Sequence, residues 1–150
     1  MNKYRSLVFF LAVTAAVALW SGQFRPGDWY AALEKPAFNP PDWVFAPAWT
    51  ALYTMMAVAA WRVWRRVGLD VSIVLWGVQL ALNGAWSWLF FGLHRTGLAL
   101  ADIMVLLAAI LLTAVCFMRR DRAAGYLMLP YLAWVGFATA LNYSLWKLNG

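Results

Sequence analysis

The sequence has few charged side chains for its length. Lys, Arg, Asp and Glu make up 12% of its 150 residues, about half the share of a soluble domain. A mean hydropathy of +0.66 places the chain among membrane proteins. The 12 basic residues lie mostly at the ends of apolar stretches, which is a topology signal. Nucleic acid is therefore not an expected partner.

Residues that form metal or catalytic sites are also scarce. Cys116 is the only cysteine, so an intrachain disulfide is impossible. His94 is the only histidine, and no His, Cys and Asp cluster has the spacing of a metal site. The chain also lacks a nucleophile beside a base and a glycine-rich phosphate loop. We expect no metal, no required cofactor, and neither a hydrolase nor a metalloenzyme.

Five stretches of at least 19 residues carry no more than one charge each. A helix of that length covers about 28 Å, close to the hydrocarbon thickness of a bilayer. The stretches are apolar on every face, unlike the alternating strands of a membrane barrel. We predict an all-α integral membrane protein, a single domain of residues 1–150 with five transmembrane helices over residues 6–24, 43–61, 71–93, 96–118 and 123–146.

Charges beside the spans predict the orientation. The N-terminus and the second and fourth loops carry eight basic residues, and the other side carries four. The N-terminus is therefore cytoplasmic if the chain lies in a bacterial inner membrane, whereas an outer-membrane or organellar location removes the basis of this rule. The first span has an alternative as a cleaved signal peptide, because Lys3 and Arg5 precede an apolar run containing Ala16-Val17-Ala18. Against this, the run continues through Trp20.

The first connection, residues 25–42, is longer than the others, and long connections in compact proteins are usually functional or disordered. Gly27 and Asp28 can cap a short helix, and three prolines then favour extended backbone. We predict a partly helical lid over one mouth of the bundle. The alternative is a plain connector whose tryptophan lies at the membrane interface.

Aromatic residues recur at helical spacing in two spans. Phe45 and Trp49 share one face of the second span, and Trp134, Ala138 and Leu141 share one face of the fifth. A large ring followed by a small residue leaves space beside it, so these faces can enclose a cavity. Ordinary packing between helices or against lipid is the alternative.

The third span has two different faces. Gln79 and Asn83 are amides that should point into the bundle, because amides are unfavourable against lipid. Gly77, Ala81 and Ala85 form a small-residue ridge on nearly the opposite face. The ridge predicts a homodimer through this span, and close packing on a neighbour within the chain is the alternative.

Asp102 is the only acidic residue inside a span and shares a face with Leu98 and Val105. An intramembrane carboxylate is a candidate proton carrier or a partner for a polar group of a ligand. Because Asp102 is six residues after Thr96, it can also simply reach interfacial water. Both interpretations stay open.

Short motifs rich in aromatic residues, asparagine and proline lie along nearly the whole chain, in one loop and three predicted helices. They are Trp29–Pro36, Asn39–Phe45, Ala48–Tyr53, Gln79–Asn83 with Trp86, Phe90–Gly92, Pro130–Trp134 and Leu141–Tyr143. In this order they resemble the TspO/MBR family, which comprises the bacterial tryptophan-rich sensory proteins and the mitochondrial translocator protein.

The resemblance implies a five-helix bundle, usually dimeric, that binds porphyrins such as protoporphyrin IX and, in some members, cholesterol and benzodiazepine-type ligands. It implies a pocket beneath the first loop, between spans one, two, four and five. This chain has Leu98 where the mitochondrial members carry an aromatic residue, which argues against affinity of this chain for the drug-like ligands of those members. By motif, the ligand-binding residues are Phe45, Ala46, Trp49, Leu98, Ala101, Asp102, Val105, Trp134, Ala138 and Leu141.

Two further groups of residues follow from the expected ligands. Leu141, Tyr143 and Lys147 fit a weak sterol-binding pattern. A porphyrin is flat and aromatic with carboxylates at one edge, so it should prefer indole faces inside and basic groups at the rim. Arg25 and Lys35 are the residues expected to supply that rim.

Three functions fit these expectations. The leading one is a membrane receptor, sensor or transporter for porphyrins in tetrapyrrole or stress regulation, with lipid or sterol as further ligands. The alternative is an enzyme that degrades porphyrin in light and oxygen, with Trp49 and Trp134 as its catalytic residues. The third is a structural or partner-binding membrane protein whose pocket is incidental.

Overall fold

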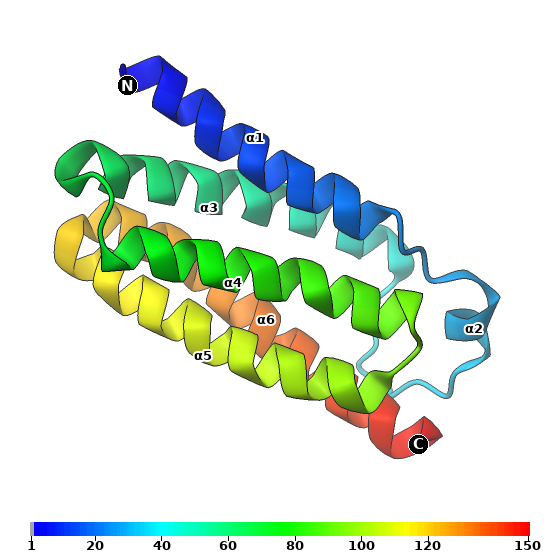
Figure 1. The fold of residues 1–150 in the computed structure, drawn as a ribbon. Helices are drawn as coiled ribbons and strands as arrows, with labels where there is room; N and C mark the ends of the chain where they lie inside the picture. The colour runs from blue at the N-terminus through cyan, green and yellow to red at the C-terminus, as the bar shows by residue number, and fades with distance from the viewer. Residues whose placement is uncertain (1) are drawn as a thin grey trace.

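The computed structural model describes residues 2–150, and all regular elements in that range are helices. Five segments are long and apolar enough to cross a membrane, and they pack into one bundle (Figure 1). The predicted all-α fold with five membrane-spanning helices is confirmed. The elements are α1 Lys3–Gly22, α2 Gly27–Ala32, η1 Asp42–Val44, α3 Phe45–Val67, α4 Val71–Ser87, η2 Trp88–Gly92, α5 Thr96–Arg120 and α6 Arg122–Asn149.

Most helices extend beyond the predicted spans at their charged ends. The second span includes the 3₁₀ turn η1 and continues in α3 to Val67, where Gly68 with a φ of 68° ends the helix. The third span is α4 followed by η2, which is a π-helix. The uncharged runs therefore mark the part of each helix that matches the hydrocarbon layer, and turn residues set the actual ends.

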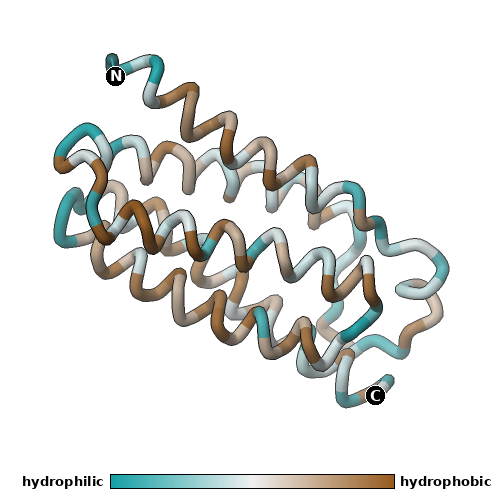
Figure 2. Tube along the Cα trace, in the orientation of Figure 1, coloured by the Kyte–Doolittle hydropathy of each residue, from teal (hydrophilic) through white to brown (hydrophobic). Residues whose placement is uncertain are grey.

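The helices are arranged around a tightly packed pair. The pair is α5 and α6, α4 packs against α5, and α1 lies over α3 and part of α4. The termini lie at opposite ends of the bundle (Figure 1), as five spans require. Hydrophilic residues gather at these two ends and hydrophobic residues lie along the helices between them (Figure 2). Which end faces the cytoplasm stays a prediction from the charges.

The two faces of the third span point as the sequence predicts. Gln79 and Asn83 are 0% and 3% exposed. Gly77 and Ala81 are exposed, and a Cβ atom added at Gly77 would meet no atom within 4 Å. Ala85 is half-buried. The amides therefore face inward and the ridge faces outward, while the homodimer through that ridge stays a prediction.

Ion pairs fix the end of the bundle that lies away from the lid. Asp121 joins α5 to α6, and its carboxylate accepts hydrogen bonds from Arg62 of α3 at 2.8 and 3.3 Å and from the backbone N–H of Ala123 at 3.1 Å. Arg66 lies 3.4 Å from the same carboxylate. Burial alone would raise the pKa of Asp121, but the hydrogen bond and charge of Arg62 outweigh it, so the pKa is lowered from its ordinary value of 3.8.

Asp121→Asn is expected to lower the free energy of unfolding by about 1 kcal/mol at neutral pH, a value reduced by the partial exposure of Arg62. Because the pKa of Asp121 is lower in the folded chain than in the unfolded chain, its contribution is full above about pH 4 and disappears as the pH falls through the folded pKa. Thermal unfolding in detergent at pH 7 and pH 3 measures this difference. Asp28→Asn, at an exposed lid residue, is the control, and an equal loss at both pH values would contradict the ion-pair explanation.

Candidate ligand cavity

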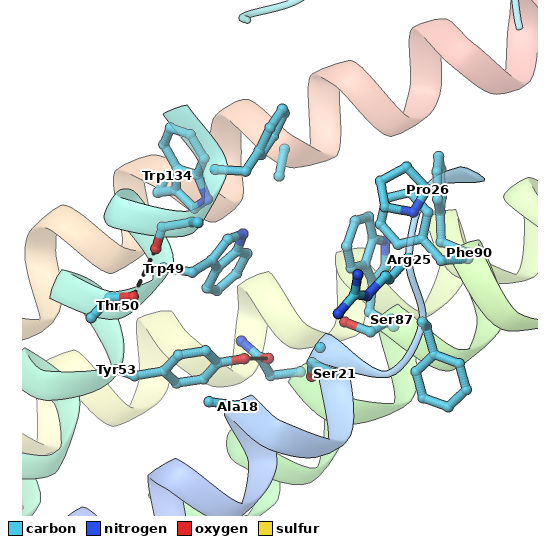
Figure 3. Close-up of a pocket in the computed structure, with 18 of the residues that line it drawn as sticks. Ala18, Ser21, Arg25, Pro26, Trp49, Thr50, Tyr53, Ser87, Phe90 and Trp134 are labelled. Carbon is cyan, nitrogen blue, oxygen red and sulfur yellow. Dashed lines mark hydrogen bonds between the residues drawn. The ribbon is translucent and has the colours of Figure 1, made fainter. Parts of the chain in front are cut away.

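A cavity of about 750 Å³ lies between α1, α3, α4 and α6, beneath residues 25–42. We call residues 25–42 the lid. Most of the lining is apolar or aromatic, and Trp49, Tyr53, Phe90 and Trp134 point into the space in Figure 3. Thr50 of α3 and Ala15 of α1 line the cavity and are also exposed, so the cavity reaches the lipid-facing surface between these helices.

Six of the predicted ligand-binding residues line this cavity. The indoles of Trp49 and Trp134 meet with ring centroids 6.4 Å apart at 90°, and Phe45 packs on Trp134 at 5.9 Å. The helical spacing of these residues therefore brings two predicted faces together, one from α3 and one from α6. Ligand binding by these residues stays a prediction. The six are Phe45, Ala46, Trp49, Trp134, Ala138 and Leu141.

The structure does not bring the predicted wall from the fourth span to this cavity, because α5 contributes no residue to its lining. Leu98 and Val105 are 47% and 57% exposed, Ala101 is exposed and Asp102 is half-buried. The buried face of α5 instead carries Ala99, Ile103, Leu106 and Ile110, which face α4 and α6. The spacing correctly grouped the four residues on one face, but it did not indicate that this face points out of the bundle.

Asp102 is nevertheless unusual among the residues of α5. Its Oδ2 atom is buried and has no hydrogen-bond partner among residues 2–150. Asp102 lies outside the cavity lining, and its contact with a ligand stays a prediction. Its role as a proton carrier or as a group that reaches interfacial water stays open.

The residues of the sterol pattern do not form one surface. Leu141 is 7% exposed and lines the cavity. Tyr143 is 49% exposed and Lys147 is also exposed, one turn apart on the other side of α6. The pattern therefore describes a linear string of residues that the helix divides between two faces.

A second aromatic wall was not predicted from spacing. Trp86 of α4 stacks on Phe90 with ring centroids 5.1 Å apart at 26°, and Phe91 packs against Trp86 edge to face at 5.7 Å. All three line the cavity. Trp86 and Phe90 are four residues apart, which is ordinary α-helical spacing, whereas Phe91 is five residues after Trp86 and lies in the π-helix η2. The α-helical repeat could have identified the pair of Trp86 and Phe90, but not Phe91, although Phe90–Gly92 was visible as a motif.

Hydrogen-bonded polar groups form the floor of the cavity. The hydroxyl of Tyr53 donates to Asn83 Oδ1 at 2.7 Å, and Asn83 Nδ2 donates to the Tyr131 hydroxyl at 2.8 Å. Tyr131 in turn donates to Gln79 Oε1 at 2.7 Å. Tyr53 and Asn83 line the cavity, whereas Tyr131 is fully buried behind them. The inward amides of α4 therefore connect α3 to α6.

The lid is partly helical, as predicted, and aromatic contacts hold it in place. Trp29 of α2 stacks on His94 with ring centroids 4.1 Å apart at 5°. The Tyr30 ring packs on Phe91 at 5.6 Å, and burial together with the charge of Asp42 raises the pKa of Tyr30 despite a hydrogen bond to Asn39. The predicted cap at Gly27 and Asp28 is wrong, because both residues lie within α2, whose N-cap is Pro26 and which has no side-chain cap.

Polar contacts also fix the lid, and one of them changes the expected role of Lys35. The backbone N–H of Glu34 donates to Asn149 Oδ1, and Asn149 Nδ2 donates to the Glu34 carbonyl, both at 2.9 Å. The Lys35 ammonium donates to the backbone carbonyls of Tyr30, Ala31 and Leu33. Lys35 does not line the cavity, so it closes the end of α2 instead of forming the expected basic rim.

Comparison with known proteins agrees with this architecture. The TspO/MBR family model matches residues 7–147. The chain is 40% identical to the tryptophan-rich protein TspO of Chlorobaculum tepidum, over 99% of each chain. It is 41% identical to the tryptophan-rich sensory protein of Cereibacter sphaeroides, over 93% of this chain and 89% of that protein.

The similarity extends to animal proteins. The chain is 40% identical to the translocator protein of Homo sapiens, over 81% of this chain and 75% of that protein. The family match covers all five membrane-spanning helices and the lid between the first two. The chain therefore belongs to the TspO/MBR family.

Proposed function

We propose that this protein is a membrane receptor or transporter that binds flat, aromatic and poorly soluble guests of the porphyrin class in the cavity beneath the lid. The observation that carries this proposal is the pair of indoles, Trp49 and Trp134, that face one apolar cavity opposite a second aromatic wall. Indole faces favour stacking against flat aromatic molecules.

The size and lining of the cavity support the same class of guest. Its volume of about 750 Å³ is within the range of sites for small molecules and cofactors, about 300–1,000 Å³. The polar groups on its floor are already paired with one another, so most of the guest contact is apolar. A guest that is insoluble in water but soluble in lipid fits a cavity that also reaches the bilayer.

The test is a titration of the purified protein in lipid nanodiscs with protoporphyrin IX, followed by tryptophan quenching and porphyrin absorbance. We expect saturable binding that Trp49→Phe with Trp134→Phe weakens about tenfold, since an aromatic pair contributes about 0.5–1.5 kcal/mol. The matched control is Trp43→Phe with Trp146→Phe, two exposed tryptophans outside the cavity. Unchanged affinity in the double variant of Trp49 and Trp134 would show that the porphyrin does not bind between these two residues. If the unsubstituted protein shows no saturable binding, then the cavity is not a porphyrin site.

An enzyme that degrades the bound porphyrin in light and oxygen is the second candidate. It is favoured by the contact of the two indoles and by Trp134 Nε1, which is buried without a hydrogen-bond partner among residues 2–150. Illumination of the complex separates the two functions. An enzyme requires the porphyrin absorbance to bleach faster with the unsubstituted protein than with the Trp49 and Trp134 variant at equal occupancy.

A further inference from the structure

We infer that Arg25, together with Ser21 and Ser87, forms a subsite for an acidic group of the guest. The inference rests on the proposed function, because all three residues line the same cavity. The guanidinium of Arg25 points into the cavity near Ser87, on the side of the cavity away from Trp134 (Figure 3). A flat guest between the aromatic walls would therefore present one edge to these groups.

Arg25 is the basic residue of the lining that has no acidic partner. None of the ion pairs among residues 2–150 includes it. Asp42 is the one acidic residue of the lining; it is exposed and is not ion-paired with Arg25. Lys35 donates its hydrogen bonds to the end of α2. A carboxylate in the cavity therefore meets a guanidinium whose two parallel donors match its geometry.

The two serines add hydroxyl donors that the protein itself does not use. Ser21 Oγ, at the end of α1, is buried near the Tyr53 hydroxyl and makes no hydrogen bond of normal geometry in the described chain. Ser87, the last residue of α4, is 8% exposed and lines the cavity, and its hydroxyl makes no side-chain hydrogen bond within residues 2–150. A buried hydroxyl without a partner is unfavourable, so an oxygen anion that accepts from Ser21 would satisfy that hydroxyl, and Ser87 would add a second donor. The rest of the lining is mostly apolar or internally paired, so this is the polar edge of the cavity.

This subsite makes the protein selective for guests with a free carboxylate over neutral guests of the same shape. Because Arg25 is exposed, its attraction for the carboxylate should weaken as the salt concentration rises. Burial of the ring between the aromatic walls should not depend on salt. Acid selectivity and shape recognition are therefore separable in one set of titrations.

The experiment compares protoporphyrin IX with its dimethyl ester, which keeps the ring and removes both negative charges. Both are titrated in nanodiscs of zwitterionic lipid with the full chain and with Arg25→Gln, Arg25→Lys and Arg95→Gln. We expect the unsubstituted protein to prefer the acid, Arg25→Gln to reduce that preference about tenfold, and Arg25→Lys to retain part of it. Different partitioning of the two probes into lipid cancels when the acid-to-ester ratios of two variants are compared.

Arg95→Gln is the matched control, because Arg95 precedes α5 at the same end of the bundle but does not line the cavity. It should leave both affinities unchanged. A preference for the acid that survives Arg25→Gln would overturn the inference while the proposed function stands. Equal loss of acid and ester binding in Arg25→Gln would also overturn it, since that would indicate a disturbed cavity. If neither probe binds the unsubstituted protein, the proposed function itself fails.

Discussion

Ala138→Trp is expected to weaken protoporphyrin IX binding by about 10-fold to 100-fold. Ala138 lies one turn after Trp134 on α6 and lines the cavity, so an indole at this position occupies the space beside Trp134. Overfilling a packed interior costs about 1–3 kcal/mol, and 1.4 kcal/mol corresponds to a factor of ten in affinity. The titration in nanodiscs described above measures the change.

Ala140→Trp is the matched control, because Ala140 is on the same helix but is exposed and outside the cavity lining. It adds an identical side chain and should leave the affinity unchanged. Circular dichroism of both variants checks that the helices are intact. Full affinity in a folded Ala138→Trp protein would place the guest elsewhere.

Gly125→Ala is expected to lower the free energy of unfolding by about 1–3 kcal/mol, the usual effect of an overpacked core. A Cβ atom added at Gly125 would lie 2.8 Å from the Cα atom of Met118. Since that atom belongs to the backbone of α5, the two helices of the most extensive pair would have to move apart. Thermal unfolding in detergent, followed by circular dichroism, measures the loss.

Gly136→Ala provides the comparison within the same helix. An added Cβ atom there meets no atom within 4 Å, and alanine favours a helix over glycine by about 1 kcal/mol. This variant should be as stable as the unsubstituted protein or slightly more stable. If both glycine variants lose stability equally, then the close approach of α5 and α6 is not the cause.

The membrane-spanning helices could be predicted because each one is determined by its own residues. A run without charge must lie in hydrocarbon, and in hydrocarbon the backbone must satisfy its own hydrogen bonds as a helix. The inward position of Gln79 and Asn83 followed from the same reasoning, since amides are unfavourable against lipid. The predicted faces of Trp49 and Trp134 also required only the helical repeat, and both line the cavity.

The neighbours of each face could not be predicted in this way. Leu98 and Asp102 share a face, but helical spacing does not say whether that face points to the cavity or out of the bundle. In the second aromatic wall, the place of Phe91 five residues after Trp86 involves a π-helical turn, which the repeat of an α-helix cannot indicate. The place of Lys35 at the rim of the cavity was predicted from its charge alone. In the folded lid, three backbone carbonyls instead accept hydrogen bonds from its ammonium group.

The amino-acid sequence by itself therefore determined which segments enter the bilayer, which side of each helix is polar and which residues follow the family motifs. These properties depend on transfer free energies and on local geometry. The tertiary structure alone decided that α1, α3, α4 and α6 enclose the cavity without α5, and that Arg25 instead of Lys35 borders it. Such choices depend on which helices pack together, a balance of contacts between residues far apart in the chain.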